Sequence, residues 1–188
     1  MLDKIINEAK LAIVATLKGA DDTITALRTA VRNQITGVLK DTGEVGITAE
    51  DAIAGVAEGA VKGASGIVAS TTEAAKNTIH AAIEATSETG VDILTVIRNA
   101  ARGTLSGAAK VGGDIARTSV AAVEAAVDAA GKVGVDTAKA VSFAVTGVLH
   151  AADNIGSEAG STVRKALLNA ASLPRDVVEK AIKGNAKK

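Results

Sequence analysis

The sequence predicts an all-α fold, built as a repeat array of about eight short helices in a compact stack or solenoid. The first observation is that every eleventh residue from position 7 to position 183 is polar, a period of ~3.67 residues per helical turn. The second is that glycines recur at multiples of 22, which indicates a 22-residue unit made of two eleven-residue repeats. One register covers nearly the whole chain, which predicts a single helical-repeat domain over 1–188 with an atypical C-terminal cap and basic tail at 172–188.

Each repeat is also amphipathic. The polar register consists of Asn7, Lys18, Thr29, Lys40, Asp51, Lys62, Glu73, Glu84, Thr95, Ser106, Arg117, Asp128, Lys139, His150, Ser161, Ser172 and Lys183. The opposite arc of the helix carries an apolar stripe, which includes Ile13, Ile24, Val31, Ile35, Ile53, Ile79, Ile97, Leu105, Val123, Val141, Val145, Val163 and Leu167. We expect this stripe to be buried. Because the chain has no Trp or Tyr and a single Phe, its core must consist of small aliphatic side chains between closely spaced helices.

Glycines followed by capping residues predict where the helices end and begin. Gly accepts the left-handed conformation that ends a helix, and Ser, Thr or Asp accepts the free N–H groups at the start of the next one. The expected helix stops are Gly46, Gly90, Gly112, Gly134 and Gly156, and the expected N-caps after them are Thr48, Asp92, Asp114, Asp136 and Ser157. In the one unit where Val68 replaces the glycine, Ser70 supplies the cap and Glu73 completes a capping box. Asp21 or Asp22 begins the second helix after Gly19.

These signals predict helices of about 27 Å each. Their expected ranges are 3–18, 22–41, 48–65, 70–87, 92–109, 114–131, 136–153 and 158–171, followed by a short tail helix after Ser172 and Pro174. Connections of two or three residues would fold each helix back on its neighbour. The alternative is one long or bent helix in which the glycines are tolerated defects.

A similarity that recurs every three units suggests a third level of repetition. The tripeptides that begin at Val31, Ile97 and Val163 are alike, and each lies three units after the one before it. On this hypothesis three helices make one structural layer.

Composition excludes several classes of function. Lys plus Arg equals Asp plus Glu, at 21 each, so the basic excess typical of nucleic-acid binding is missing. The lack of Cys excludes disulfides and thiolate metal sites. The first ten residues include acidic side chains that a signal peptide does not have, and uncharged runs such as 140–152 are shorter than the ~20 residues of a transmembrane helix. We therefore expect a mature, soluble, cytoplasmic protein.

The sequence offers no catalytic, cofactor-binding or metal-ligating set, and we expect no enzyme activity and no cofactor. His80 and His150 lie far apart in the chain and in different registers, with no third ligand near either. Asp92, Asp114 and Asp136 could line one edge of a stack and bind cations, but N-capping explains the same series.

Three further features leave alternatives open. Glycines at 55, 59 and 63 form a ladder that predicts close packing of one helix on another. Phe143 lies in a polar register, where it either contacts a partner or covers an edge of the core. Asn33, Asn77, Asn99 and Asn154 share that register, where they form either solvated surface or a row that faces a ligand.

Segments such as 55–66 and 131–143 resemble the eleven-residue amphipathic repeats of synucleins, exchangeable apolipoproteins and late-embryogenesis-abundant proteins. The resemblance lies in period and composition and covers nearly the whole chain. It implies a chain that coats lipid, or that protects membranes and proteins during drying.

Two functions follow as expectations. The first is a non-enzymatic structural or interaction protein, which buries its Ala/Val/Ile stripe between tightly packed helices. The alternative is an amphipathic coat on a lipid or granule surface, or a desiccation and stress-protection protein. A protein or a lipid surface is the expected partner, self-association stays open, and neither nucleic acid nor a transmembrane segment is expected.

Overall fold

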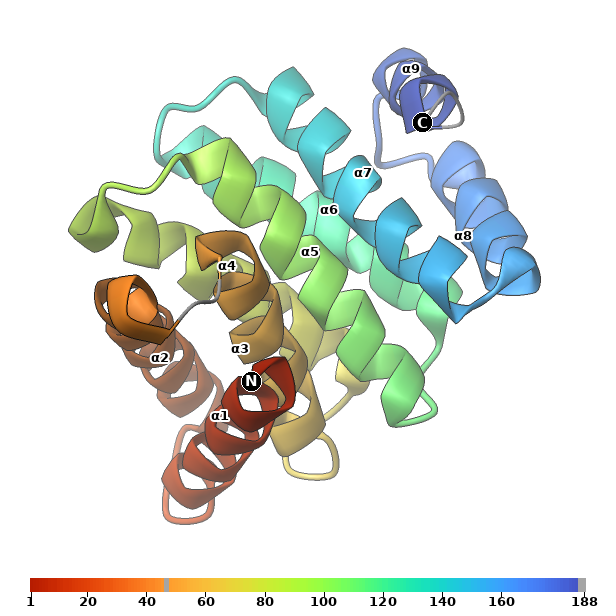
Figure 1. Cartoon of the computed structure of the whole chain (residues 1–188). Coiled ribbons are helices and arrows are strands. Elements are labelled where there is room, and N and C mark those ends of the chain that lie inside the picture. The colour runs from red at the N-terminus through yellow and green to blue at the C-terminus, as the bar shows by residue number, and fades with distance from the viewer. Residues whose placement is uncertain (46–47, 186–188) are drawn as a thin grey trace.

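The computed structural model describes residues 1–45 and 48–185, with the backbone alone described at 41–45 and 87–89. Nine α-helices occupy these ranges (Figure 1): α1 Leu2–Leu17, α2 Thr23–Val45, α3 Ala49–Ala64, α4 Thr71–Thr89, α5 Ile93–Lys110, α6 Ile115–Lys132, α7 Thr137–Ile155, α8 Ser157–Asn169 and α9 Arg175–Asn185. The all-α repeat array is confirmed, and separate helices replace the alternative of one long helix. The tail helix after Pro174 is α9.

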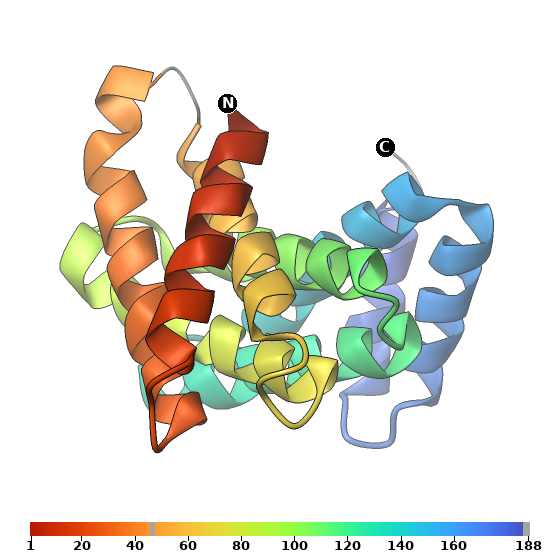
Figure 2. The ribbon, with the colours of Figure 1, turned by 90° about the horizontal axis from the view of Figure 1, so that it is seen from below.

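The helices form two layers, because each helix packs on the helices one and two places away in the chain. The odd-numbered helices α1, α3, α5, α7 and α9 form the inner layer, and the even-numbered helices α2, α4, α6 and α8 form the outer layer. Figure 2 shows the stack as an arc, with α2 at the left, α4 and α6 along the bottom and α8 at the right, all outside the odd-numbered helices.

The structural repeat is therefore a pair of helices. The first residues of α3, α5 and α7 are Ala49, Ile93 and Thr137, which are evenly spaced by two units each. The hypothesis of a three-helix layer is wrong, because α2 and α8 lie in the outer layer and α5 in the inner one. Alternate helices pack side by side, so a step of three helices changes layer and the three-unit similarity marks no structural layer.

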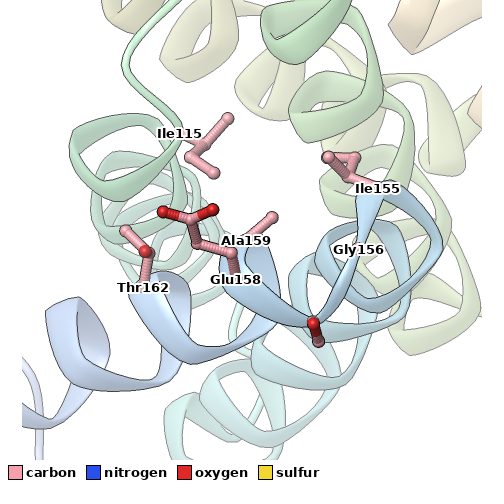
Figure 3. Close-up of a pocket in the computed structure, with 7 residues that line it drawn as sticks. Ile115, Ile155, Gly156, Glu158, Ala159 and Thr162 are labelled. Carbon is pink, nitrogen blue, oxygen red and sulfur yellow. The ribbon is translucent and has the colours of Figure 1, made fainter.

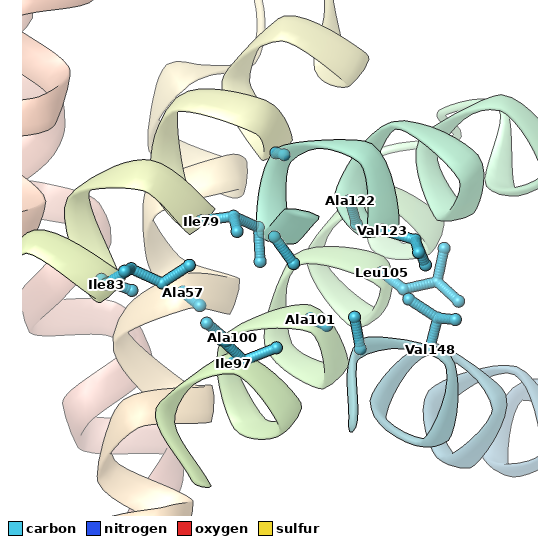
Figure 4. Packing of buried hydrophobic residues seen from close by; sticks show 14 of the residues in the cluster. Ala57, Ile79, Ile83, Ile97, Ala100, Ala101, Leu105, Ala122, Val123 and Val148 are labelled. Carbon is cyan, nitrogen blue, oxygen red and sulfur yellow. The ribbon is translucent and has the colours of Figure 1, made fainter. Parts of the chain in front are cut away.

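The apolar stripe lies between and within the layers. All of its members are buried except Ile24, which is partly buried. In Figure 4 Leu105 of α5 lies beside Val123 of α6 and Val148 of α7, and Ile83 of α4 lies beside the small Ala57 of α3. Each fully buried aliphatic side chain contributes about 1.5–3 kcal/mol relative to exposure. The stripe thus holds the stack together from inside.

Five of the expected N-caps make the hydrogen bonds that the cap chemistry requires. Thr48 Oγ1 accepts from the Asp51 N–H at 3.1 Å, and Ser70 Oγ accepts from the Glu73 N–H at 3.1 Å. Carboxylates do the same at the starts of α5, α6 and α7, where Asp92, Asp114 and Asp136 accept from N–H groups two or three residues ahead at 2.8–3.1 Å. Of the two aspartates before α2, Asp22 is the cap. Each such cap stabilises its helix by about 1 kcal/mol.

Ser157 is not an N-cap, contrary to expectation. It is the first residue of α8, and it makes no capping hydrogen bond. Only Gly156 separates α7 from α8, so this one residue ends the first helix and precedes the second. A two-residue stop and start does not fit in a one-residue connection.

The glycine stops end their helices in two ways. Gly90 and Gly156 are themselves the C-caps of α4 and α7, whereas Gly112 and Gly134 follow the C-caps Val111 and Val133. Gly112 has φ 71° and Gly134 has φ 76°, and the next N–H bonds back to Ala108 O at 2.8 Å and Ala130 O at 2.9 Å. This pattern is the Schellman motif, which needs a left-handed residue. Gly46 lies outside the described residues.

The end of α3 was missed by the 22-residue register. Gly66, with φ 83°, turns the chain after the C-cap Ser65, two residues before Val68. A glycine does end this helix, but it is not a multiple of 22 residues from the other helix-ending glycines, so the 22-residue spacing does not predict it.

From Gly59 onward, glycine in the inner layer and alanine in the outer layer alternate at one repeated position, whereas the two earlier units have Ala15 in α1 and Gly37 in α2. Gly59, Gly103 and Gly147 follow one another at intervals of two units, and Ala81 and Ala125 lie midway between them. A Cβ on Gly59 would be 2.5 Å from Ile6 O, and a Cβ on Gly103 would overlap Ala54 O. The missing methyl groups let odd-numbered helices approach more closely than a side chain permits. We infer that this difference curves the stack toward its inner layer.

The glycine ladder of α3 belongs to the same contact. Gly59 and Gly63 lie against the backbone of α1, where Cβ atoms would come within 2.5 Å of Ile6 O and 2.8 Å of Lys10 O. The expectation of close packing of one helix on another is confirmed.

Candidate binding groove

The expected capping residues do not converge on a site. Asp92 and Asp136 begin α5 and α7 on one edge of the stack. Asp114 begins the antiparallel α6 on the opposite edge, a helix length away. Each carboxylate already accepts backbone N–H groups. Within the described ranges no group of three His, Asp or Glu side chains is placed to hold a metal ion.

The two histidines lie in different layers. His80 on α4 is half-buried in the outer layer, with Nε2 3.5 Å from Asp128 Oδ2. Burial lowers the pKa of His80 and the nearby Arg28 cation lowers it further, while Asp128 opposes the shift. His150 on α7 lies on the inner layer. The pair therefore cannot act on one substrate.

The inner layer carries two neighbouring hollows, and Arg102 lines both of them. The larger hollow, about 500 Å³, is lined by Glu50, Arg98, Asn99, Arg102, Thr146, His150, Asp153 and Asn185. The smaller, about 200 Å³, is lined by Leu2, Ile6, Asp51, Ala54, Gly55, Glu58, Arg102, Gly103, Ser106 and Asn154. We call these two hollows together the inner groove. It crosses the layer from α1 to α9, which places residues from all five odd-numbered helices in it.

Ion pairs between α3 and α5 form one wall of the inner groove. Arg98 Nη2 lies 2.8 Å from Glu50 Oε1, and Arg102 Nη2 lies 2.8 Å from Asp51 Oδ1. The Arg102 guanidinium holds the pKa of Asp51 below its ordinary value of 3.8. The buried Glu58 binds Lys110 at 2.6 Å. Such partly exposed pairs each contribute about 0–1 kcal/mol, but they fix which residues of α3 and α5 stand opposite one another.

The asparagine row predicted from the sequence divides between the layers. Asn99 and Asn154 lie in the inner groove. Asn77 lies in the outer layer, where its Oδ1 accepts from Arg28 Nε at 2.8 Å. The row divides because a step of one unit changes layer. Asn185, which follows no register, was missed by sequence reasoning.

Phe143 is partly buried and packs against the core, which agrees with the covered-edge interpretation.

A separate hollow of about 490 Å³ lies where α7 turns into α8 (Figure 3). Ile115 and Ile155 lie on opposite sides of it, with Glu158 between them, and Gly156 of the one-residue connection also lines it. Glu158 is the only titratable group among its lining residues. A single carboxylate without a second acid, base or nucleophile does not form a catalytic set.

None of the described helices is both long enough and apolar enough to span a bilayer.

Comparison with known proteins identifies the fold and no family. No protein-family model matches the chain, and no curated protein matches it. Among solved structures, the crystal structure of the de novo designed helical repeat protein DHR7 is similar, with a TM-score of 0.51 and 16% sequence identity, over 100% of this chain and 95% of that one. At this identity the similarity bears on the fold alone. The two-layer stack and this likeness together establish the chain as a helical repeat protein.

Proposed function

We propose that this protein is a non-enzymatic scaffold, which folds by itself and presents the inner groove to a protein partner. The observation that carries this proposal is the burial of the apolar stripe, in which every member except Ile24 is buried, for example Ile53, Ile97 and Leu105 at 0% exposure. Because these side chains are packed against other helices, they cannot contact a lipid surface unless the stack opens. Repeat stacks of this kind commonly bind along the face toward which they curve.

The exposed large apolar residues support the same proposal. Among the described residues they are Met1, Leu2, Leu11, Val133 and Ile155. Leu2 and Leu11 are both on α1, but they are nine residues apart and so point to opposite sides of that helix. Val133 and Ile155 lie at the ends of α6 and α7, so these residues do not form the continuous apolar face that a lipid coat needs.

Thermal unfolding of the full chain, followed by circular dichroism at 222 nm with and without anionic vesicles, tests the proposal. We expect a strongly helical signal that melts in one cooperative step and does not change with vesicles. Low helicity that rises on addition of vesicles would instead favour the lipid-coat function.

The variant Ile97→Asp sharpens this test. In a packed stack it buries an unpaired carboxylate and should lower the free energy of unfolding by more than about 4 kcal/mol. Leu11→Asp is the matched control, because Leu11 is 66% exposed, and it should change stability by less than about 0.5 kcal/mol. Equal urea midpoints for the two variants would rule out the packed scaffold.

A further inference from the structure

Asn99 is a buried side chain with an open hydrogen-bond acceptor at the inner groove. It is 2% exposed, and its Nδ2 donates to Thr95 O at 2.9 Å. Its Oδ1 accepts no hydrogen bond from the described residues, and this oxygen keeps some exposed surface. Asn99 also lines the larger hollow. Because no described side chain donates to it, this carboxamide oxygen takes its hydrogen bond from water in the hollow or from a ligand that replaces the water.

In the outer layer, the asparagine at the same repeat position makes hydrogen bonds with both ends of its carboxamide group. Asn77 also donates its Nδ2 to the carbonyl four residues before it, at 3.0 Å, and Arg28 fills its Oδ1. Glu50 precedes Asn99 by the same interval in the sequence as Arg28 precedes Asn77. A carboxylate cannot donate, and Glu50 is bound to Arg98. The exchange of Arg for Glu leaves the inner-layer acceptor open.

Two other features of the inner groove indicate the chemistry of a ligand that would fit it. Arg98 makes one ion pair, through Nη2, so that its other N–H groups are available to an acceptor in the hollow. In the smaller hollow, Gly55 and Gly103 contribute no side chains to the lining, and Leu2, Ile6 and Ala54 contribute apolar atoms. The other lining residues are polar or charged: Asp51, Glu58, Arg102, Ser106 and Asn154. A volume of about 200 Å³ with this mixed lining suits a small side chain.

The lining also argues against other ligand classes. Four carboxylates and two guanidinium groups line the two hollows, which disfavours a polyanion such as nucleic acid. Among the described residues that line them there is no Phe, Tyr or Trp, and His150 is the one aromatic ring, so the hollows lack the series of aromatic side chains on which successive bases stack. A peptide main chain is neutral and offers both an N–H donor and a carbonyl acceptor.

We propose that the inner groove binds an extended peptide segment of a partner protein: a main-chain N–H donates to Asn99 Oδ1, a main-chain carbonyl accepts from Arg98, and a small side chain enters the smaller hollow, which Ser106 lines. This inference rests on the proposed scaffold function.

Selection of a display library of random twelve-residue peptides on the full chain tests the proposal. The selected peptides are then measured by fluorescence anisotropy against the wild-type chain and three variants. Asn99→Leu removes the acceptor, Ser106→Leu fills the smaller hollow, and Ala166→Leu places the same bulk in a hollow on the outer layer as a control. Circular dichroism melting verifies that each variant folds.

We expect Asn99→Leu and Ser106→Leu each to weaken binding by about tenfold or more, and Ala166→Leu to leave it unchanged. N-methylation of one main-chain amide of the peptide should cause a similar loss against the wild-type chain, a readout that needs no variant. The proposal is overturned if no peptide is enriched, or if the enriched peptides bind both groove variants with wild-type affinity.

Failure here is distinguishable from failure of the scaffold function. If the chain melts cooperatively, vesicles do not change the melt and no peptide binds through the groove, the scaffold proposal stands and the peptide-site proposal is wrong. A chain that becomes helical only on vesicles would remove both.

Discussion

At the scale of single residues, the chain tolerates a few buried polar atoms that its packing does not need. Thr78 and Thr118 are fully buried, and their Oγ1 atoms have no hydrogen-bond partner among the described residues. Thr104, equally buried, donates its Oγ1 to Ala101 O at 3.0 Å. The difference separates a hydroxyl that costs stability from one that is compensated.

Replacing Thr118 by Val should therefore stabilise the protein by about 1 kcal/mol, because the change removes an unpaired hydroxyl and keeps the shape. Thr104→Val is the control, and it should be neutral or destabilising because it breaks a hydrogen bond. Urea unfolding of both variants measures the difference. A lower midpoint for Thr118→Val would show that the hydroxyl has a partner.

His80 should make stability depend on pH in a defined direction. Its folded-state pKa lies below the ordinary 6.5, chiefly because burial disfavours the charged form, so the unfolded chain binds the proton more readily. Stability contributed by neutral His80 is complete above pH 6.5 and declines as the pH falls from 6.5 toward the folded-state pKa.

Unfolding measured between pH 7 and pH 5 should show that decline in the wild-type chain and not in His80→Gln. A second decline, below pH 3.8, should remain in both, because Asp51 and Asp128 have lowered pKa values from Arg102 and Lys132 respectively. If the two chains had the same profile between pH 7 and pH 5, His80 would not be the group responsible.

At the scale of elements, the contact between odd-numbered helices depends on the absence of a methyl group. Gly103→Ala improves the intrinsic helix propensity of α5 but places its Cβ against Ala54 O. We expect a net loss of about 1–3 kcal/mol in the free energy of unfolding, because α3 and α5 must separate.

Gly37→Ala is the matched control for this prediction. Gly37 lies inside α2, and a Cβ there would meet nothing within 4 Å. This variant should gain about 0.5–1 kcal/mol. Thermal melts of the two variants should therefore shift in opposite directions, and a gain from Gly103→Ala would contradict the close approach.

The elements also show what a sequence can and cannot predict. The starts of α3 to α7 follow from capping chemistry, which is local and needs only a few neighbouring residues. The layer of each helix depends on packing between helices two places apart in the chain, so the three-unit similarity misled. The different surroundings of Asn77 and Asn99 depend on Arg28 and Glu50, which share one register, but it is the packing of helices two places apart that brings each of them to its asparagine. The sequence therefore does not predict the inner groove as a site, although Asn99, Asn154 and His150, which line it, stand out in the sequence.

At the scale of the whole molecule, stability should vary along the stack. Each helix contacts only its neighbours one and two places away, so central helices are supported on both sides and terminal ones on one. Native-state hydrogen exchange should be slowest in α4, α5 and α6 and fastest in α1 and α9. Equal protection in all helices would indicate that the stack opens only as a whole.

The alternation of Gly59, Ala81, Gly103, Ala125 and Gly147 sets a rule for how this chain can change its length. Duplication of two units adds two helices and returns every later glycine to the inner layer. Duplication of a single unit adds one helix, so that glycines move to the outer layer and alanines to the inner one, where the backbones would clash. Lineages of this chain would therefore lengthen or shorten by pairs of helices.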